Sequence, residues 1–279
     1  MSTKFPENRT RSFTLEIGDQ PDGFPFDAST GTSPAALSYF GNQTLGGVSD
    51  NAGWLSLPKQ CGEDLASRRS GSFARAITIR IQDPSPTQEN RRAHISKALS
   101  TAMFKLSKAN GCATAQTDGD PALHAPSPVR PLNLTQACSL PHFSIPNESR
   151  PGDVPQQETE QVSRKDHQMW SCDIRFKEAS EPDISITMTQ DKNLMPSLSK
   201  GIDRSTPATV GWKASGSTSG PLLASCEKID TYFSIGISNE YRQLIEKNKG
   251  ISASEARKKI FQSFINSMGG QLGCPGITP

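Results

Sequence analysis

The clearest alternation of apolar and polar positions lies near the end of the chain, in residues 229–237. Every second position is Ile, Thr or Phe, and the positions between are Asp, Tyr, Ser and Gly, which is the period of a half-buried strand. A helix is predicted directly afterwards. Ser238 can cap its first turn, Glu240 places a negative charge there, and Gly250 can end it in a left-handed conformation.

A second helix is predicted immediately after the first. Ser252 and Glu255 have the spacing of a capping box. Apolar residues then recur at helical spacing over residues 256–268, and Gly269 with Gly270 is expected to end the run. The pattern therefore predicts a strand followed by a helical hairpin.

Residues 77–111 predict a second strand and helix. Ile77, Ile79 and Ile81 share one face of the strand, because they stand at every second position. The helix is expected to begin near Thr87 and to end before Gly111. Its apolar stripe consists of Ile95, Ala98, Leu99, Ala102, Met103 and Leu106.

Three shorter strands are predicted, at residues 13–18, 170–177 and 184–188. The last two are expected to pair as a hairpin, because Pro182 and Asp183 supply turn chemistry between them.

The remaining segments predict irregular structure. Residues 19–72 carry isolated apolar clusters, around Tyr39 and Trp54, that are expected to form surface loops or to bind partners. In residues 112–166 the prolines are spaced too closely for a helix or a central strand, which predicts a linker or a mobile insertion. Such a segment could present apolar residues such as Phe143 to a partner, or act as a tether alone. Residues 211–220 predict a flexible Gly/Ser loop.

Together these elements predict an α+β fold, with a small, mostly antiparallel sheet, helices on one face, and interruptions by long irregular proline-rich segments. The expected organisation is an irregular arm with one short strand (1–72), a strand–helix unit (73–111), a proline-rich linker or insertion (112–166), strands plus the C-terminal helical hairpin packing with 73–111 (167–270), and a tail (271–279).

Composition limits this core. Only 33% of the residues are hydrophobic, and the chain holds 21 Pro and 22 Gly, so we expect compact regions separated by irregular ones. The formal net charge of +2 favours no polyanionic partner by itself. Six dispersed cysteines and a polar N-terminus without a signal-peptide core predict reduced thiols and a cytoplasmic or nuclear protein, not secreted by a signal peptide.

Basic residues on two of the predicted helices are candidates for contacting a partner or a nucleic acid. They are Arg91, Arg92, Lys97, Lys105 and Lys108, with Phe104 among them, and Arg257, Lys258 and Lys259. Phe104 could stack on a nucleic acid or be buried by a partner; alternatively, another part of this chain covers it. Arg257, Lys258 and Lys259 lie in a helix–glycine–helix layout similar to that of helix-turn-helix proteins. Three adjacent charges spread around a helix, however, which favours a solvated basic turn on a packing helix over a nucleic-acid contact.

Several hydroxyl groups are candidates for phosphorylation, which would add negative charge and strong hydrogen-bond acceptors. Four precede proline and two follow an Arg–Arg pair: Ser33, Ser85, Ser127 and Thr206, and Ser70 and Ser72.

The sequence contains no motif for a cofactor, a metal or an activated nucleophile. Cys138 and His142, for instance, lack the closely spaced ligand pairs of structural zinc sites. The leading hypothesis is a non-catalytic structural or interaction protein (scaffold, accessory or virion-type) that binds protein partners through flexible segments. One alternative is a nucleic-acid-binding protein that uses the basic helix faces. The other is an enzyme with a site assembled from dispersed residues such as Asp173, His94 or His167.

Overall fold

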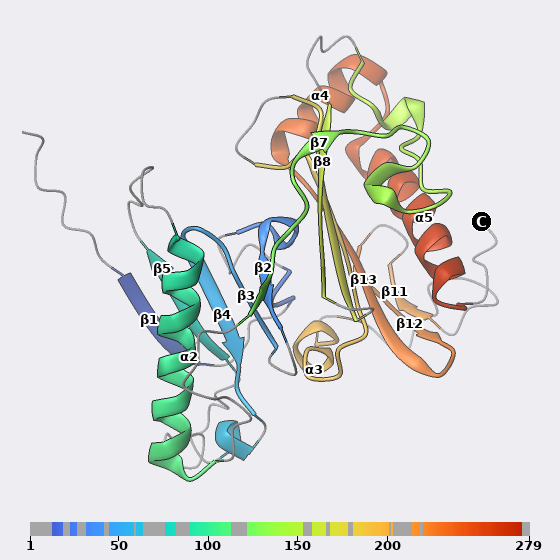
Figure 1. The fold of residues 1–279 in the computed structure, drawn as a ribbon. Coiled ribbons are helices and arrows are strands. Elements are labelled where there is room, and N and C mark those ends of the chain that lie inside the picture. Colours follow the sequence, from blue (N-terminus) through green and yellow to red (C-terminus); the bar gives the residue numbers. More distant parts are fainter. Residues whose placement is uncertain are drawn as a thin grey trace, which may run out of the picture. The chain divides into compact units, whose positions relative to one another are not determined.

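The structure is a computed structural model in which the chain combines helices with two antiparallel sheets (Figure 1). It describes residues 13–18, 23–26, 32–41, 45–58, 60–63, 76–81, 90–112, 122–152, 158–165, 168–177, 181–200, 202, 214–217 and 220–274. The mixed α+β class expected from the sequence is therefore correct. The described residues form two sheets, of six and seven strands, where a single small one was expected.

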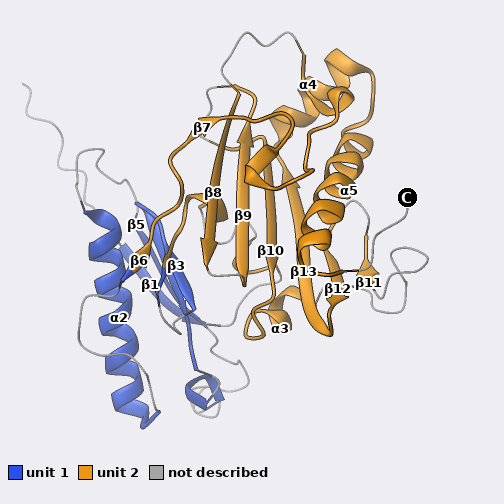
Figure 2. Cartoon of the chain, turned by 45° about the vertical axis from the view of Figure 1, so that its right-hand side comes forward, with its two compact units in different colours: residues 1–19, 40–122 blue, residues 20–39, 123–279 orange. Residues whose placement is uncertain are grey.

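The chain divides into two compact units (Figure 2). Unit 1 comprises residues 1–19 and 40–122, and unit 2 comprises residues 20–39 and 123–279. The two short strands β2 (Ser38–Phe40) and β6 (Leu123–His124) lie where the chain passes from one unit to the other. This division differs from the expected organisation, because residues 1–72 and 112–166 contribute to both units.

Unit 1 is built on four antiparallel strands, which are neighbours in the order β1, β5, β4 and β3. Their bounds are Phe13–Gly18 (β1), Ala76–Ile81 (β5), Ala52–Ser56 (β4) and Gly46–Val48 (β3). The predicted strands at 13–18 and 77–81 are confirmed. Trp54, which was expected in a surface loop or at a partner, is instead buried in β4, with 1% of its surface exposed.

Helix α2 (Arg91–Asn110) packs on β3, β4 and β5 of unit 1. The close approach depends on Gly53, because a Cβ atom there would lie 2.9 Å from the side chains of both Ile95 and Leu99. Gly111 follows the helix in the left-handed conformation, at φ 69°, as the sequence predicts. The predicted start near Thr87 lies outside the described residues.

Unit 2 contains the seven-stranded sheet, in the order β11, β12, β13, β10, β9, β8, β7. The bounds are Arg130–Pro131 (β7), Thr159–Lys165 (β8), Met169–Arg175 (β9), Ile184–Thr189 (β10), Ala214–Gly216 (β11), Leu222–Cys226 (β12) and Ile229–Ile237 (β13). Strands β9 and β10 pair antiparallel, which confirms the predicted hairpin, and β13 has the predicted bounds. Strand β11 lies in the region expected as a Gly/Ser loop.

One face of this sheet packs against helix α5 (Ala253–Gln271), which follows α4 (Asn239–Lys249). The predicted caps are confirmed, since Ser238 accepts a hydrogen bond from Tyr241 N and Ser252 accepts one from Glu255 N. Helix α5 continues through Gly269 and Gly270, where it was expected to stop. Phe264 of α5 lies at the centre of an aromatic cluster with Phe143, Trp170, Phe233 and Phe261.

A row of hydroxyl side chains crosses four strands of the same sheet. Ser163, Ser171, Thr187 and Ser234 are register partners on β8, β9, β10 and β13. Thr187 and Ser234 share a 2.6 Å hydrogen bond, and Ser163 donates to the backbone oxygen of Leu37 at 2.8 Å. The short helix η2 (Pro34–Ala36) contacts β8, β9 and β10, and the row's residues on these three strands, Ser163, Ser171 and Thr187, are buried inside unit 2.

The segment expected as a linker is largely folded into unit 2. The short helices η3 (Ala137–Ser139) and η4 (Asn147–Ser149) and the strand β8 all fall within residues 112–166. Phe143 is fully buried in the hydrophobic core with Leu140 and Ile145. Prolines exclude regular helix but not burial, and a disulfide from Cys138 to Cys172 of β9 holds the segment in place.

The expectation of reduced thiols is wrong for this structure, because all six cysteines form disulfides. Two of the bonds repeat one arrangement. Cys61 follows β4 and pairs with Cys112 after α2, while Cys226 ends β12 and pairs with Cys274 after α5. The partners are 51 and 48 residues apart. Cys61 lies in a helical turn at residues 60–63 after β4, whereas Cys226 is the last residue of β12, and in both bonds the partner cysteine follows a later helix of the same unit.

Candidate functional site

The outer face of α2 is a basic surface. His94, Lys97, Thr101, Lys105 and Lys108 are all exposed. Their spacing of three, seven, eleven and fourteen residues from His94 places them on one side of the helix, over about 21 Å at 1.5 Å per residue. Helix α2 contains no acidic residue at all. We call the side chains of Lys97, Lys105 and Lys108 the α2 basic face.

The other predicted residues of α2 have contacts within unit 1. Arg91 is buried and donates to the backbone oxygen of Asp50 at 3.4 Å. Arg92 forms an ion pair with the Asp50 carboxylate at 3.1 Å. The hydrogen bond from Arg92, and then the charges of Arg92 and Arg91, outweigh partial burial and lower the pKa of Asp50. Phe104 is half-buried, so its ring is only partly available to a partner.

The basic residues of α5 do not form one surface. Arg257 points its Nη2 atom to the backbone oxygen of Ile235, at 2.7 Å. Lys259 lies 3.2 Å from both Glu148 and Glu255, and its hydrogen bonds to these two carboxylates raise the pKa of its ammonium group. Only Lys258 is exposed. The three adjacent charges therefore diverge around the helix, as their spacing predicts.

Two of the predicted phosphorylation sites lie among the described residues, and both hydroxyl groups are engaged. Ser33 donates to Asp173 Oδ1 at 2.6 Å, and Ser127 Oγ accepts a hydrogen bond from Val162 N at 2.9 Å. Ser70, Ser72, Ser85 and Thr206 lie outside the described residues.

The described residues proposed for an enzyme site are divided between the two units. Asp173 is buried in unit 2, His94 is exposed in unit 1, and His167 lies outside the described residues. Burial raises the pKa of Asp173, although hydrogen bonds from Ser33 and Ser185 and the charge of Arg175 act in the opposite direction. The Asp173 carboxyl thus supports the packing of residues 33–39 on the sheet.

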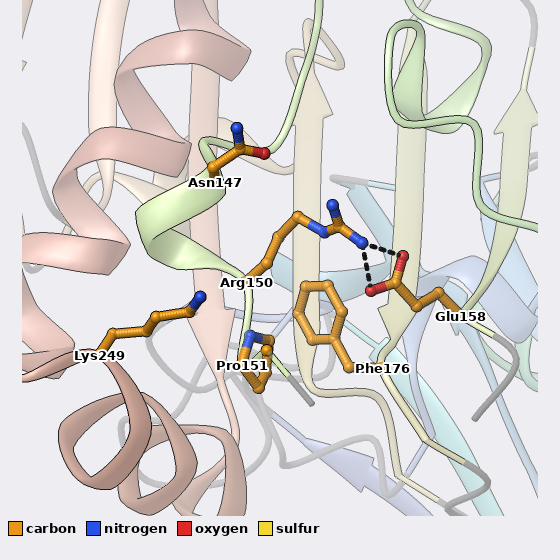
Figure 3. A pocket seen from close by; sticks show the side chains of 7 residues that line it. Asn147, Arg150, Pro151, Glu158, Phe176 and Lys249 are labelled. Atoms are coloured by element: carbon orange, nitrogen blue, oxygen red, sulfur yellow. Dashed lines mark hydrogen bonds and ion pairs between the residues drawn. The ribbon is translucent and has the colours of Figure 1, made fainter. Parts of the chain in front are cut away.

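Unit 2 also has a pocket of about 250 Å³, shown in Figure 3. Polar groups reach it from three segments: Asn147 and Arg150 from the η4 region, Glu158 from the start of β8, and Lys249 from the end of α4. Its apolar lining is supplied by Pro151, Gly152 and Phe176.

The charges in this pocket are unequal. Nη2 of Arg150 donates to both carboxylate oxygens of Glu158, at 2.8 and 2.9 Å. Nε of Arg150 is buried and has no hydrogen-bond partner among the described residues. Lys249 makes no ion pair with another described residue. The Arg150–Glu158 pair is neutral, so the described residues that line the pocket carry a net positive charge from Lys249.

The pocket loop, residues 147–152, is held to α4 by two hydrogen bonds. The Tyr241 hydroxyl donates to the backbone oxygen of Ser149 at 2.7 Å, and Asn248 donates to that of Pro151 at 3.0 Å. Sequence reasoning missed this pocket, because it assigned the loop to a linker. The only signal in the sequence was Gly152, which follows a proline. In the structure Gly152 adopts a positive φ of 49°.

The parts of the chain that the structure describes contain no group of three or more His, Cys, Asp and Glu side chains placed to hold a metal ion. Among the same residues, no helix is long and apolar enough to cross a membrane. Comparison of the chain with protein-family models, curated proteins and solved structures finds no match.

Proposed function

We propose that this chain is a non-catalytic interaction protein that binds an acidic protein partner through the α2 basic face. The observation that carries the proposal is the exposed row of Lys97, Lys105 and Lys108 on a helix without one acidic side chain. Such a row favours a negatively charged partner, because its charges add along one line.

The half-buried Phe104 lies next in sequence to Lys105, so a partner along this face can contact apolar surface as well as charge. From Lys97 to Lys108 the face extends over about 16 Å, which is the length of an extended peptide of about five residues at 3.3–3.6 Å per residue. An acidic strand or loop of a partner therefore fits it.

The three disulfides support a location in an oxidising compartment. This proposal replaces the expected cytoplasmic or nuclear location, whose premise was reduced thiols. An oxidising location also favours a protein over a nucleic acid as the partner, since nucleic acids are concentrated in reducing compartments. Nucleic-acid binding by the same row remains the alternative outcome of the test below.

Binding of fluorescently labelled probes to the full chain would test the proposal. The probes are an acidic peptide of about five residues and a single-stranded oligonucleotide, each measured by anisotropy across ~50–300 mM salt. We expect the peptide to bind, with affinity that falls as salt rises because the charges are exposed.

The decisive variant is K105E/K108E. We expect it to weaken peptide binding by about tenfold or more, because two attractive exposed charges become repulsive at ~0.5–1 kcal/mol each. The matched control is K247E/K258E, which makes the same change of charge at two exposed lysines of unit 2. Equal losses in both double variants would show that net charge alone drives binding and would refute the α2 assignment. Tight binding of the oligonucleotide without the peptide would replace the protein partner by a nucleic acid.

A further inference from the structure

We propose that the pocket between the 147–152 loop and the end of α4 binds a carboxylate group of a small ligand or of a partner's side chain. This inference concerns unit 2 and is independent of the α2 basic face. It begins from the unequal charges: Arg150 and Lys249 supply two positive groups, and Glu158 supplies one negative group.

The net charge of the pocket selects the ligand class. Glu158 neutralises Arg150 and holds its guanidinium through two hydrogen bonds from Nη2. Lys249 remains without an ion pair among the described residues, so one unit of positive charge is unmatched. A monovalent carboxylate balances this charge, whereas a phosphate dianion would leave the pocket negative.

The pocket also has hydrogen-bond donors to offer. The Nε group of Arg150 is buried without a described partner, which is costly for a cationic donor. Asn147 also lines the pocket, and in Figure 3 it lies above the Arg150 side chain, on the side away from Glu158. A ligand oxygen can accept from the Asn147 amide and from Lys249, which line the pocket, whereas Nε of Arg150 is buried and offers it no donor.

The backbone at Gly152 leaves space for the side chain of Lys249. A Cβ atom at Gly152 would lie 2.9 Å from Lys249 Nζ and 3.1 Å from Lys249 Cε. The ammonium group therefore passes directly over a residue that has no side chain, at a φ of 49° that favours glycine. This contact keeps Lys249 at the pocket although its helix position is exposed.

The size of the pocket limits the ligand. Its volume of about 250 Å³ is below the ~300–1,000 Å³ of drug-sized sites, so it fits a group no larger than an amino-acid side chain. Pro151 and Phe176 offer apolar contacts to the carbon atoms next to the carboxylate.

Titration of the full chain, followed by NMR signals of the residue 147–150 backbone amides, would test this site. The probes are propionate, inorganic phosphate and propylammonium at equal ionic strength. We expect propionate to saturate with a dissociation constant on the order of 1–10 mM, the range of a single charged contact with little buried surface. An N-acetylglutamyl amide probe distinguishes the two sources of the carboxylate. An affinity equal to that of propionate indicates a partner's side chain, and an affinity weaker than that of propionate indicates a free small acid.

The variant K249M is expected to raise the propionate dissociation constant about fivefold or more, because it removes the unmatched charge. K247M is the matched control, since Lys247 is an exposed lysine on the same helix outside the pocket lining. Unchanged affinity in K249M, equal losses in both variants, saturation by phosphate alone, or no shift at residues 147–150 would each overturn the proposal.

Discussion

The hydroxyl group of Tyr241 donates a 2.7 Å hydrogen bond to the backbone oxygen of Ser149, which connects helix α4 to the loop that shapes the pocket. Both residues are buried, so water cannot replace either partner. The Tyr241 ring also stacks on Phe176, with ring centroids 5.7 Å apart, so one side chain fixes the pocket loop and supports the pocket wall.

We expect Tyr241→Phe to lower the free energy of unfolding by about 1–3 kcal/mol, because it keeps the ring and leaves the Ser149 carbonyl buried without a partner. Urea unfolding would measure the change. The same deletion at Tyr39, whose hydroxyl donates to the Pro34 oxygen at a longer 3.3 Å, should cost less. A larger effect of Tyr39→Phe would contradict this ranking.

A second prediction concerns Asp173 and pH. Burial raises the pKa of this carboxyl above its ordinary 3.8, so the folded state keeps a proton that the unfolded state releases. The stability that this proton provides is fully present below the unfolded pKa and is lost as pH rises through the folded pKa.

Asp173→Asn removes this titration and retains an oxygen that can accept from Ser33 and Ser185. We expect the free energy of unfolding of the wild type, relative to the variant, to decrease as pH rises above the ordinary aspartate pKa of 3.8. Urea unfolding at several pH values would measure the difference. Asp183, whose pKa is also raised by burial, titrates in both proteins, so its contribution cancels from the difference in unfolding free energy. A difference that does not change with pH would contradict the prediction.

A third prediction concerns the disulfides. The unfolded, unreduced protein should show no free thiol in a colorimetric assay, because all six cysteines are paired. Removing either long-range bond, as Cys61→Ser with Cys112→Ser or as Cys226→Ser with Cys274→Ser, should lower the free energy of unfolding by about 2–5 kcal/mol. Detection of six thiols in protein purified without reductant would refute the pairing.

A fourth prediction tests whether residues 122–152 belong to the core. Phe143 is fully buried against Phe264, and we expect Phe143→Ala to cost about 3–5 kcal/mol of stability through the lost contacts and the cavity. Val129→Ala is the control from the same segment, since 54% of Val129 is exposed and its effect should be within about 0.5 kcal/mol. Similar small effects at both positions would indicate that the segment is a tether.

Sequence reasoning succeeded where one segment carries its own signal. Strand β13 and the caps at Ser238 and Ser252 follow from neighbouring residues, because alternation and capping act over a few positions. It failed for Trp54 and Phe143, which stand in segments without clear periodicity. Their burial depends on strands and helices that are distant in sequence.

The candidate sites divide in the same way. The lysines of the α2 basic face could be identified from helical spacing alone, whereas the pocket joins Arg150, Glu158 and Lys249 from three segments that no spacing relates. Cysteine pairing was also out of reach, since Cys61 and Cys112 are 51 residues apart in sequence yet have Cα atoms 5.4 Å apart.

The amino-acid sequence by itself determined the local elements of this protein: its best strands, the helix ends and the charge pattern of α2. Only the tertiary structure decided which proline-rich residues are buried, which cysteines meet and where a positive pocket forms. The physical reason is the separation in sequence over which each effect acts. Backbone geometry and capping are set by adjacent residues, but burial, disulfide formation and electrostatic pockets require groups that come together only when the whole unit has folded.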